Sequence, residues 1–251
     1  MKKNKIKDRR PPALKDEHMP KDFSIALKAY GGGGTTKSLN PNPKKLKYQS
    51  MKGFETEYKN IIDYIVRITY CIWEDKNIGY IYDTYSKDCR VWDEFGLQFG
   101  SEKIVADTVH TNNAFPDIRL FADEVIWAGD EKNSFHTSHR TIITGKNTGY
   151  SKFSPPTGKS VRLLCIANCV AKNNEIYYEN VVYDTVTLIK QLGLNVNEIA
   201  REIANQGNVG PFAPDFKSSK PKRKISKSKN LEFEIPNKIS NIRDFSKAVF
   251  N

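Results

Sequence analysis

The chain has 251 residues and a formal net charge of +11, which is enough length for one large domain or two small ones. The charge is unevenly placed: residues 51–205 carry 17 Lys and Arg against 21 Asp and Glu, and the rest of the chain carries 23 against 8. This distribution excludes a basic central domain, so contact with nucleic acid or an anionic membrane is a role for the two tails alone.

Two further classes are disfavoured by composition. No run approaches the roughly 20 apolar residues of a membrane span, and the charged amino terminus lacks the apolar stretch of a signal peptide. The four cysteines form no CxxC pair and show no metal-ligand spacing, so we interpret them as reduced and structural. We therefore expect a cytoplasmic protein without a metal site.

The amino-terminal segment, residues 1–50, is rich in Lys, Pro, Gly and Asn and is predicted to be an arm that is flexible or draped on the core. Its GGGGTTK sequence at residues 31–37 lacks the GxxxxGK[ST] pattern of a phosphate-binding loop. A folded domain is predicted over residues 51–206, and a basic tail over residues 207–251.

Helical spacing dominates the first half of the domain. Apolar residues recur every three or four positions from Phe54 to Ile72, which predicts an amphipathic helix of about five turns. A short helix is expected over residues 77–82, a first strand over residues 86–92, and a third helix over residues 102–112. Pro116 ends that third helix, because proline disfavours helical geometry in the residue before it.

Four strands are predicted next, over residues 118–128, 134–144, 160–171 and 176–184. The connection over residues 145–159 is long enough to cover the mouth of a cavity. Helices followed by an antiparallel meander predict an α+β domain in which about three helices pack on the concave face of a curved antiparallel sheet, with a last short helix over residues 197–205.

The last predicted strand leads into a helix that Gly193 caps. Strand geometry puts Tyr178, Asn180, Val182 and Asp184 on one face. Asp184 lies where the strand gives way to the helix, and two interpretations stay open. It is either the N-cap of the helix, a position that Asp favours, or a group with a chemical role.

Several sequence blocks resemble the SnoaL-like ester cyclase or polyketide cyclase family of the nuclear transport factor two-like superfamily. They are FPDIRLFADEVIWAGD at residues 115–130, the TG-x-x-x-G frame at residues 144–149, PPTGK at residues 155–159 and EIYYENVVYDTVTLIKQLGL at residues 175–194. The resemblance covers roughly residues 54–204. It implies a cone-shaped α+β barrel with an interior pocket, a homodimer formed through the outer face of the sheet, and chemistry without a cofactor.

The resemblance also implies site residues. Asp184 matches the acid/base aspartate of the cyclases, and apolar neighbours such as Val182 would raise its pKa. Where the cyclases have a histidine, this chain has Asn168, and their GTHTG turn is GKNTG here, with Asn147 in place of histidine. Both departures argue against polyketide cyclisation of the known kind, because an amide cannot carry a proton between groups.

Other candidates come from FHTSHR at residues 135–140. His136 and His139 are three apart and face opposite sides of a strand, so they do not share a metal. We select His139 as the pocket residue, with a hydrogen-bonded sheet histidine as the alternative. Arg140 would hold substrate at the pocket mouth, or else pair with an acid on the dimer face.

The predicted function is a small-molecule enzyme that performs acid/base chemistry next to a carbonyl, as a cyclase, isomerase, dehydratase or hydrolase. Asp184 and His139 are its predicted catalytic residues, and Arg140, Asn168, Asn180 and Trp92 its predicted substrate contacts; no cofactor is expected, and the substrate is a carbonyl or carboxylate compound. The alternative is a non-catalytic ligand-binding or dimerising interaction module.

Overall fold

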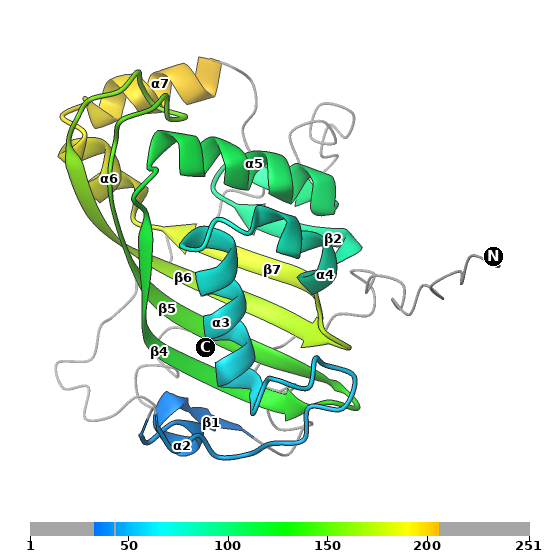
Figure 1. Ribbon diagram of the computed structural model, residues 1–251. Coiled ribbons are helices and arrows are strands. Elements are labelled where there is room, and N and C mark those ends of the chain that lie inside the picture. Colours follow the sequence, from blue (N-terminus) through cyan, green and yellow to red (C-terminus); the bar gives the residue numbers. More distant parts are fainter. Residues whose placement is uncertain (1–32, 43, 206–251) are drawn as a thin grey trace, which may run out of the picture. The chain divides into compact units, whose positions relative to one another are not determined.

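A seven-stranded mixed sheet organises the computed structural model, which describes residues 33–42 and 44–205 (Figure 1). The strand order is β1-β4-β5-β6-β7-β2-β3. No helix among the described residues is both long enough and apolar enough to cross a membrane. The predicted contacts of residues 1–32 and 206–251, including their nucleic-acid and membrane contacts, lie outside the described residues.

The predicted meander is confirmed. Strands β4 (Arg119–Asp130), β5 (Ser134–Lys146), β6 (Ser160–Lys172) and β7 (Glu175–Tyr183) pair consecutively and antiparallel. The β6–β7 turn uses two residues with positive φ, Asn173 and Asn174, a conformation that Asn adopts more readily than most residues. The register in this meander places every inward side chain described below.

The domain is α+β as predicted, but its sheet is mixed and not wholly antiparallel, which corrects that part of the prediction. Strand β2 (Tyr85–Asp93) runs parallel to β7, and β3 (Gly96–Phe99), which sequence reasoning missed, pairs antiparallel with β2. Helix α5 (Ser101–Ala114) and the three strands β4 to β6 separate β2 from β7 in sequence, and a parallel pair needs such a long crossover.

The other edge of the sheet is formed from the predicted amino-terminal arm. Strand β1 (Gly33–Thr35) pairs with β4, and the short helix α2 (Thr36–Leu39) follows it. A Cβ on Gly33 would lie 2.9 Å from the Trp127 carbonyl oxygen, so glycine permits this close approach. The glycine-rich segment therefore has an architectural role in its described part.

The first long helix is shorter than predicted. Helix α3 (Ile61–Trp73) begins after Asn60, whose side chain accepts a hydrogen bond from the Asp63 amide at 2.8 Å. Phe54 and Tyr58 continue the apolar spacing but lie in turns, and both pack against Tyr64 in edge-on ring contacts. The N-cap residue Asn60 thus sets the start of the helix, which periodicity alone places too early in the chain.

One face of α3 is the centre of the core. Ile61, Ile62, Ile65, Ile68 and Ile72 are all at most 3% exposed. Burial of each isoleucine side chain stabilises the fold by about 1.5–3 kcal/mol relative to an exposed one. A 3-10 turn (Ile78–Tyr80) and helix α4 (Ile81–Thr84) occupy the region predicted as a short helix.

Helices α3 and α5 lie on the same face of the sheet (Figure 1). Phe115 follows α5 directly, as the Pro116 argument predicts. After β7 come α6 (Thr185–Gln191) and α7 (Val196–Asn205). Gly193 has a φ of +78° beyond α6, which confirms it as the C-terminal cap.

Candidate active site

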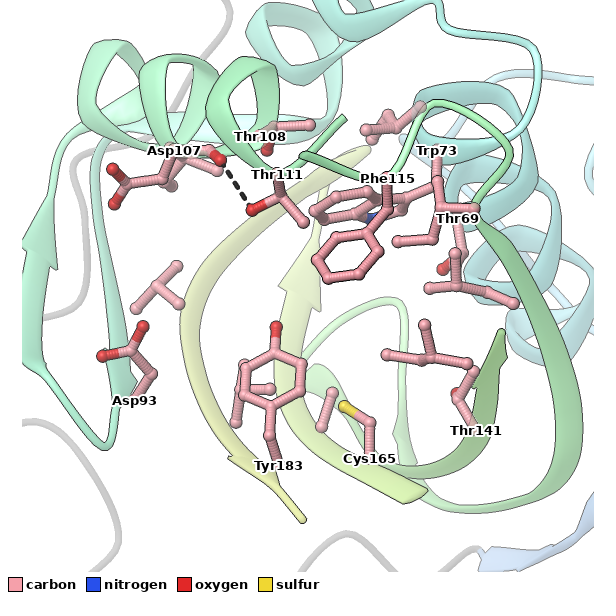
Figure 2. Close-up of a pocket in the computed structure, with 18 of the residues that line it drawn as sticks. Thr69, Trp73, Asp93, Asp107, Thr108, Thr111, Phe115, Thr141, Cys165 and Tyr183 are labelled. Carbon is pink, nitrogen blue, oxygen red and sulfur yellow. Dashed lines mark hydrogen bonds between the residues drawn. The ribbon is translucent and has the colours of Figure 1, made fainter. Parts of the chain in front are cut away.

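A cavity of about 220 Å³ lies between the inner face of the sheet and the helices α3 and α5 (Figure 2). Its walls are mainly aliphatic and aromatic, and Figure 2 shows Trp73 and Phe115 along one side, with Cys165 and Tyr183 opposite them. Apolar walls with a few convergent polar groups are typical of small-molecule sites. Its polar groups therefore decide what chemistry the cavity offers.

Glu179 is the most perturbed acid in this cavity. It lies in β7 beside Cys169 of β6 and Val91 of β2, on the inner face, and keeps only 9% of its surface exposed. Burial raises the pKa of its carboxyl to about 7, although hydrogen bonds from Tyr85 and Cys169 lower it in part. The Tyr85 hydroxyl donates to Glu179 Oε2 at 3.0 Å. Near neutral pH this carboxyl can either take up or release a proton.

His139 is the second polar group and lines the cavity as predicted. It lies in β5 between Val125 of β4 and Ala167 of β6, and is 4% exposed. Burial lowers its pKa to about 4, so the imidazole is neutral at physiological pH. Its Nε2 is buried and has no hydrogen-bond partner among the described residues.

The two groups lie on the same inner face but not in contact. Two strand spacings and two residues along the strands separate Glu179 from His139, a Cα distance of roughly 12 Å. The small side chain of Ala167 lies between them. A ligand on this part of the sheet can therefore contact both.

Tyr183 adds a hydroxyl that points into the cavity in Figure 2. Burial is the main reason why its pKa is raised well above the ordinary value, and nearby Cys165, Glu179, Glu94 and Asp93 raise it further. The hydroxyl therefore stays protonated and can serve as a hydrogen-bond donor.

Cysteines form another part of the same wall. Cys165 and Cys169 line the cavity, and Cys89 is buried nearby in the core. All four cysteines are free thiols, as predicted. Burial raises the pKa of Cys165 to about 12, so this thiol is not an activated nucleophile.

The mouth of the cavity is bounded by two connections. The predicted covering loop contributes Lys152 and Phe153, the end of β2 contributes Asp93, and the β2–β3 turn contributes Phe95. The Lys152 ammonium lies 4.5 Å from the Phe95 ring centre and 4.0 Å from Asp93 Oδ2. Within the loop, Asn147 is fully buried, donates to the carbonyls of Ala114 and Gly149, and accepts from Thr157.

Asp184 lies elsewhere. It is exposed, caps α6 by accepting a hydrogen bond from the Thr187 amide at 3.1 Å, and does not line the cavity. Hydrogen bonds from Thr187 lower its pKa, which corrects the expectation that Val182 and other apolar neighbours raise it. Val182 is itself 64% exposed, so it cannot supply the expected burial. The geometry is that of the capping alternative.

The predicted substrate contacts are brought together on the outer face of the sheet. Asn168 pairs with Asn180, which pairs with Trp92, and none of the three lines the cavity. Arg140 forms an ion pair with Asp123 at 2.6 Å, with about half of its side chain exposed. This is the second of its two predicted roles, pairing with an acid away from the pocket.

The sequence contained a signal for Glu179. One face of β7 carries Tyr177, Val181 and Tyr183. This face is bulkier and more apolar than the opposite face, which carries Asn180 and leads to Asp184. The bulkier face is the better candidate for burial, and Glu179 is the carboxylate in the middle of it. The match of Asp184 to a family motif directed attention to the other face.

No group of three or more His, Cys, Asp or Glu side chains is placed to hold a metal ion within residues 33–42 and 44–205. The cavity instead offers the Glu179 carboxyl with a pKa near neutrality, the neutral imidazole of His139 and the hydroxyl of Tyr183. These groups can move a proton and donate hydrogen bonds to an oxygen that becomes negative.

No family model matches the chain, and no curated protein matches it. Solved structures do match. A candidate SnoaL-like polyketide cyclase from Jannaschia sp. CCS1 is 16% identical with a TM-score of 0.49, and the match covers 59% of this chain and 99% of that one. The candidate polyketide cyclase IdmH from Streptomyces antibioticus is 17% identical with a TM-score of 0.46, covering 53% and 98%.

The chain is also similar to AclR, a candidate hydroxylase from Streptomyces galilaeus, at 18% identity and a TM-score of 0.45, covering 52% of this chain and 92% of that one. These matches include the family that the sequence motifs resemble. All three TM-scores are below 0.5, so the function proposed below rests on this chain's own residues.

Proposed function

We propose that the chain is a small-molecule enzyme that moves a proton at the carbon next to a carbonyl group. The observation that carries this proposal is Glu179, a buried carboxyl with a pKa of about 7 that lines a mainly apolar cavity. Its pKa suits a general base and acid near neutral pH, where both protonation states are populated.

The chemistry proceeds in two steps. The Glu179 carboxylate takes the proton from carbon, and the electron pair of that C–H bond moves to give an enolate with its negative charge on oxygen. We propose that the neutral imidazole of His139, in the tautomer with its proton on Nε2, and the Tyr183 hydroxyl donate hydrogen bonds to that oxygen. Glu179 then returns the proton to carbon, to a leaving group, or to the oxygen of a second carbonyl that the enolate has attacked.

The outcome depends on the substrate. Return of the proton to a different carbon gives an isomerase, loss of a β-hydroxyl gives a dehydratase, and attack of the enolate on a second carbonyl gives a cyclase. The proposal covers these three reactions. Side chains suffice for each, and the proposed step uses no cofactor.

The test is hydrogen exchange at carbon. We expect the full-length protein to catalyse exchange of the α-hydrogens of 2-indanone for deuterium in D2O, measured by NMR. Replacement of Glu179 with Gln should reduce the rate about 10²–10⁴-fold, because glutamine keeps the shape but cannot take a proton. The proposal is wrong if Glu179→Gln, folded as judged by circular dichroism, exchanges at the wild-type rate on any ketone that the wild type turns over.

A second candidate is a dimerising or ligand-binding module without catalysis. It is favoured by the outer face of the sheet, where large apolar side chains are exposed: Phe121, Ile126, Leu164, Ile166 and Val182 are each between 37% and 64% exposed. Clusters of this kind mark interaction surfaces. We propose that this face pairs with a second copy of the chain, a role compatible with either an active or an inactive cavity.

A further inference from the structure

The volume of the cavity limits what it can enclose. A cavity of 150 Å³ in another protein holds a benzene molecule, so about 220 Å³ accommodates about nine non-hydrogen atoms. The enclosed part of a ligand is therefore a single ring with a short substituent, and any larger part must extend through the mouth.

The charges around the cavity are predominantly negative. Four carboxylates line it: Asp93, Glu94, Asp107 and Glu179. Among the lining residues of the described chain, Lys152 is the only lysine or arginine, and it lies at the mouth with 35% of its side chain exposed. Asp107 is also paired with Lys103, which is half exposed on the outer side of α5. The closed end around Glu179 has no such cation.

The neighbouring titratable groups are consistent with this charge. Burial is the largest cause of the raised pKa of the Cys165 thiol, and the carboxylates of Glu179 and Glu94 raise this pKa further. Glu179, Glu94 and Asp93 act in the same direction on Tyr183. No lysine or arginine lowers either pKa, so both groups are in a negative potential.

We infer that the cavity excludes organic anions by the sign of their charge, and that its substrate presents an uncharged carbonyl group, on about nine enclosed atoms, to Glu179. A carboxylate or phosphate in this cavity would lose its water and lie near Glu179 without a fixed cation at the closed end. Of the expected carbonyl or carboxylate substrates, only the carbonyl class fits. The carbonyl part of this inference rests on the proposed function, and the exclusion of anions does not.

Three molecules of equal size separate charge from shape. Acetophenone, benzoate and α-methylbenzylammonium each have nine non-hydrogen atoms and one ring, and carry charges of zero, −1 and +1. We would measure the affinity of each for the full-length protein at pH 8 by NMR titration. We expect acetophenone to bind and benzoate to bind at least about tenfold more weakly, a difference well above the precision of such a titration.

Each outcome decides the inference. Binding of the ammonium compound at least as tight as that of acetophenone supports exclusion by the sign of the charge. Equal rejection of both ions would show that the cavity rejects any charge, which overturns the role assigned to its carboxylates. Benzoate binding as tightly as acetophenone overturns the exclusion itself. Failure of all three to bind would overturn the assignment of the cavity as an enclosure for a single ring.

Two variants test whether the Glu179 carboxylate causes the preference for acetophenone over benzoate. Glu179→Gln removes the carboxylate at the closed end and should reduce the preference for acetophenone over benzoate several-fold. Glu198→Gln makes the same chemical change on the exposed face of α7, and should leave the preference unchanged. An equal effect of both would overturn the local explanation. Binding with the expected preference but without hydrogen exchange on 2-indanone would sustain this inference while rejecting the proposed function.

Discussion

At the scale of single residues, Glu179 and His139 have opposite effects on how the free energy of unfolding changes with pH. The pKa of Glu179 rises from 4.5 to about 7 on folding, so its contribution is complete below pH 4.5 and is lost as the pH rises through 7. The pKa of His139 falls from 6.5 to about 4, so its contribution is present above pH 6.5 and is lost as the pH falls through 4. Each shift corresponds to about 3 kcal/mol.

This opposition predicts a sign change between two variants. Between pH 4.5 and 6.5 the two groups change the free energy of unfolding with opposite slopes, and these slopes cancel in the wild type. The free energy of unfolding of Glu179→Gln should rise with pH relative to wild type, because only the histidine term remains, and that of His139→Gln should fall. Urea unfolding at a series of pH values measures both slopes. Parallel profiles for the two variants and the wild type would contradict the assigned shifts.

Asp184 and Glu179 make a second pair at this scale. Asp184→Asn keeps an oxygen for the Thr187 amide, and Asn is as good an N-cap as Asp, so we expect a change in stability of less than about 0.5 kcal/mol. We also expect full exchange activity on any ketone substrate, in contrast to Glu179→Gln. Loss of activity in a stable Asp184→Asn protein would restore the role that the family resemblance implies.

At the scale of elements, the loop over residues 147–159 depends on Asn147. The Asn147 side chain donates to two carbonyls and accepts from the Thr157 amide and hydroxyl. Asn147 itself has no exposed surface. Asn147→Ala leaves these partners unsatisfied, and should cost about 3 kcal/mol of stability. Asn147→Asp keeps the acceptor for Thr157 but sets a carboxylate oxygen against the two carbonyls in a site without solvent, so its cost should be at least as large.

Trypsin cleavage after Lys152 reports the loop directly. Its rate should be higher in Asn147→Asp and Asn147→Ala than in the wild type, because each variant loses the hydrogen bonds to the two carbonyls. Cleavage at one rate in all three proteins would show that the loop is held by other contacts, such as that of Gly149 with Ala114.

Elements were predictable where the signal is local. The meander strands, α5 and the Gly193 cap follow from alternation, periodicity and special residues, and each was predicted within a few positions. The start of α3 was not, because one capping side chain outweighed seven residues of continuing periodicity. The parallel pairing of β2 with β7 depends on contacts between distant segments, which no local pattern encodes.

The residues of the candidate site divide in the same way, into those marked by local sequence and those that depend on distant contacts. Strand alternation allowed only one of two histidines three apart to face inward, and the resemblance of Ser138, His139 and Arg140 to a triplet of the family selected His139. Glu179 was not identified, because its significance comes from burial by α3, α5 and β2 together with the Tyr85 hydroxyl, all distant in sequence. A raised carboxyl pKa is a property of the assembled cavity, so strand alternation could mark Glu179 for burial but could not show that its pKa lies near 7.

At the scale of the whole molecule, the outer face of the sheet predicts self-association. Ile166 and Val182 are direct cross-strand neighbours, and both are exposed in the single chain. Pairing this face with a second copy would remove these side chains from water, which favours a dimer by about 25 cal/mol for each Å² of apolar surface. We therefore expect sedimentation equilibrium to give twice the chain mass of 28.7 kDa.

Substitution of this face should dissociate the dimer. Val182→Asp puts a charge at the centre of the proposed contact, and two such charges face each other or lie buried without a partner, so we expect a monomer across the concentration series. Tyr48→Asp is the matched control, because Tyr48 is 78% exposed but lies outside the strands of the sheet. A Val182→Asp dimer, or a monomeric wild type, would contradict association through this face, and would leave the exposed apolar residues to another partner.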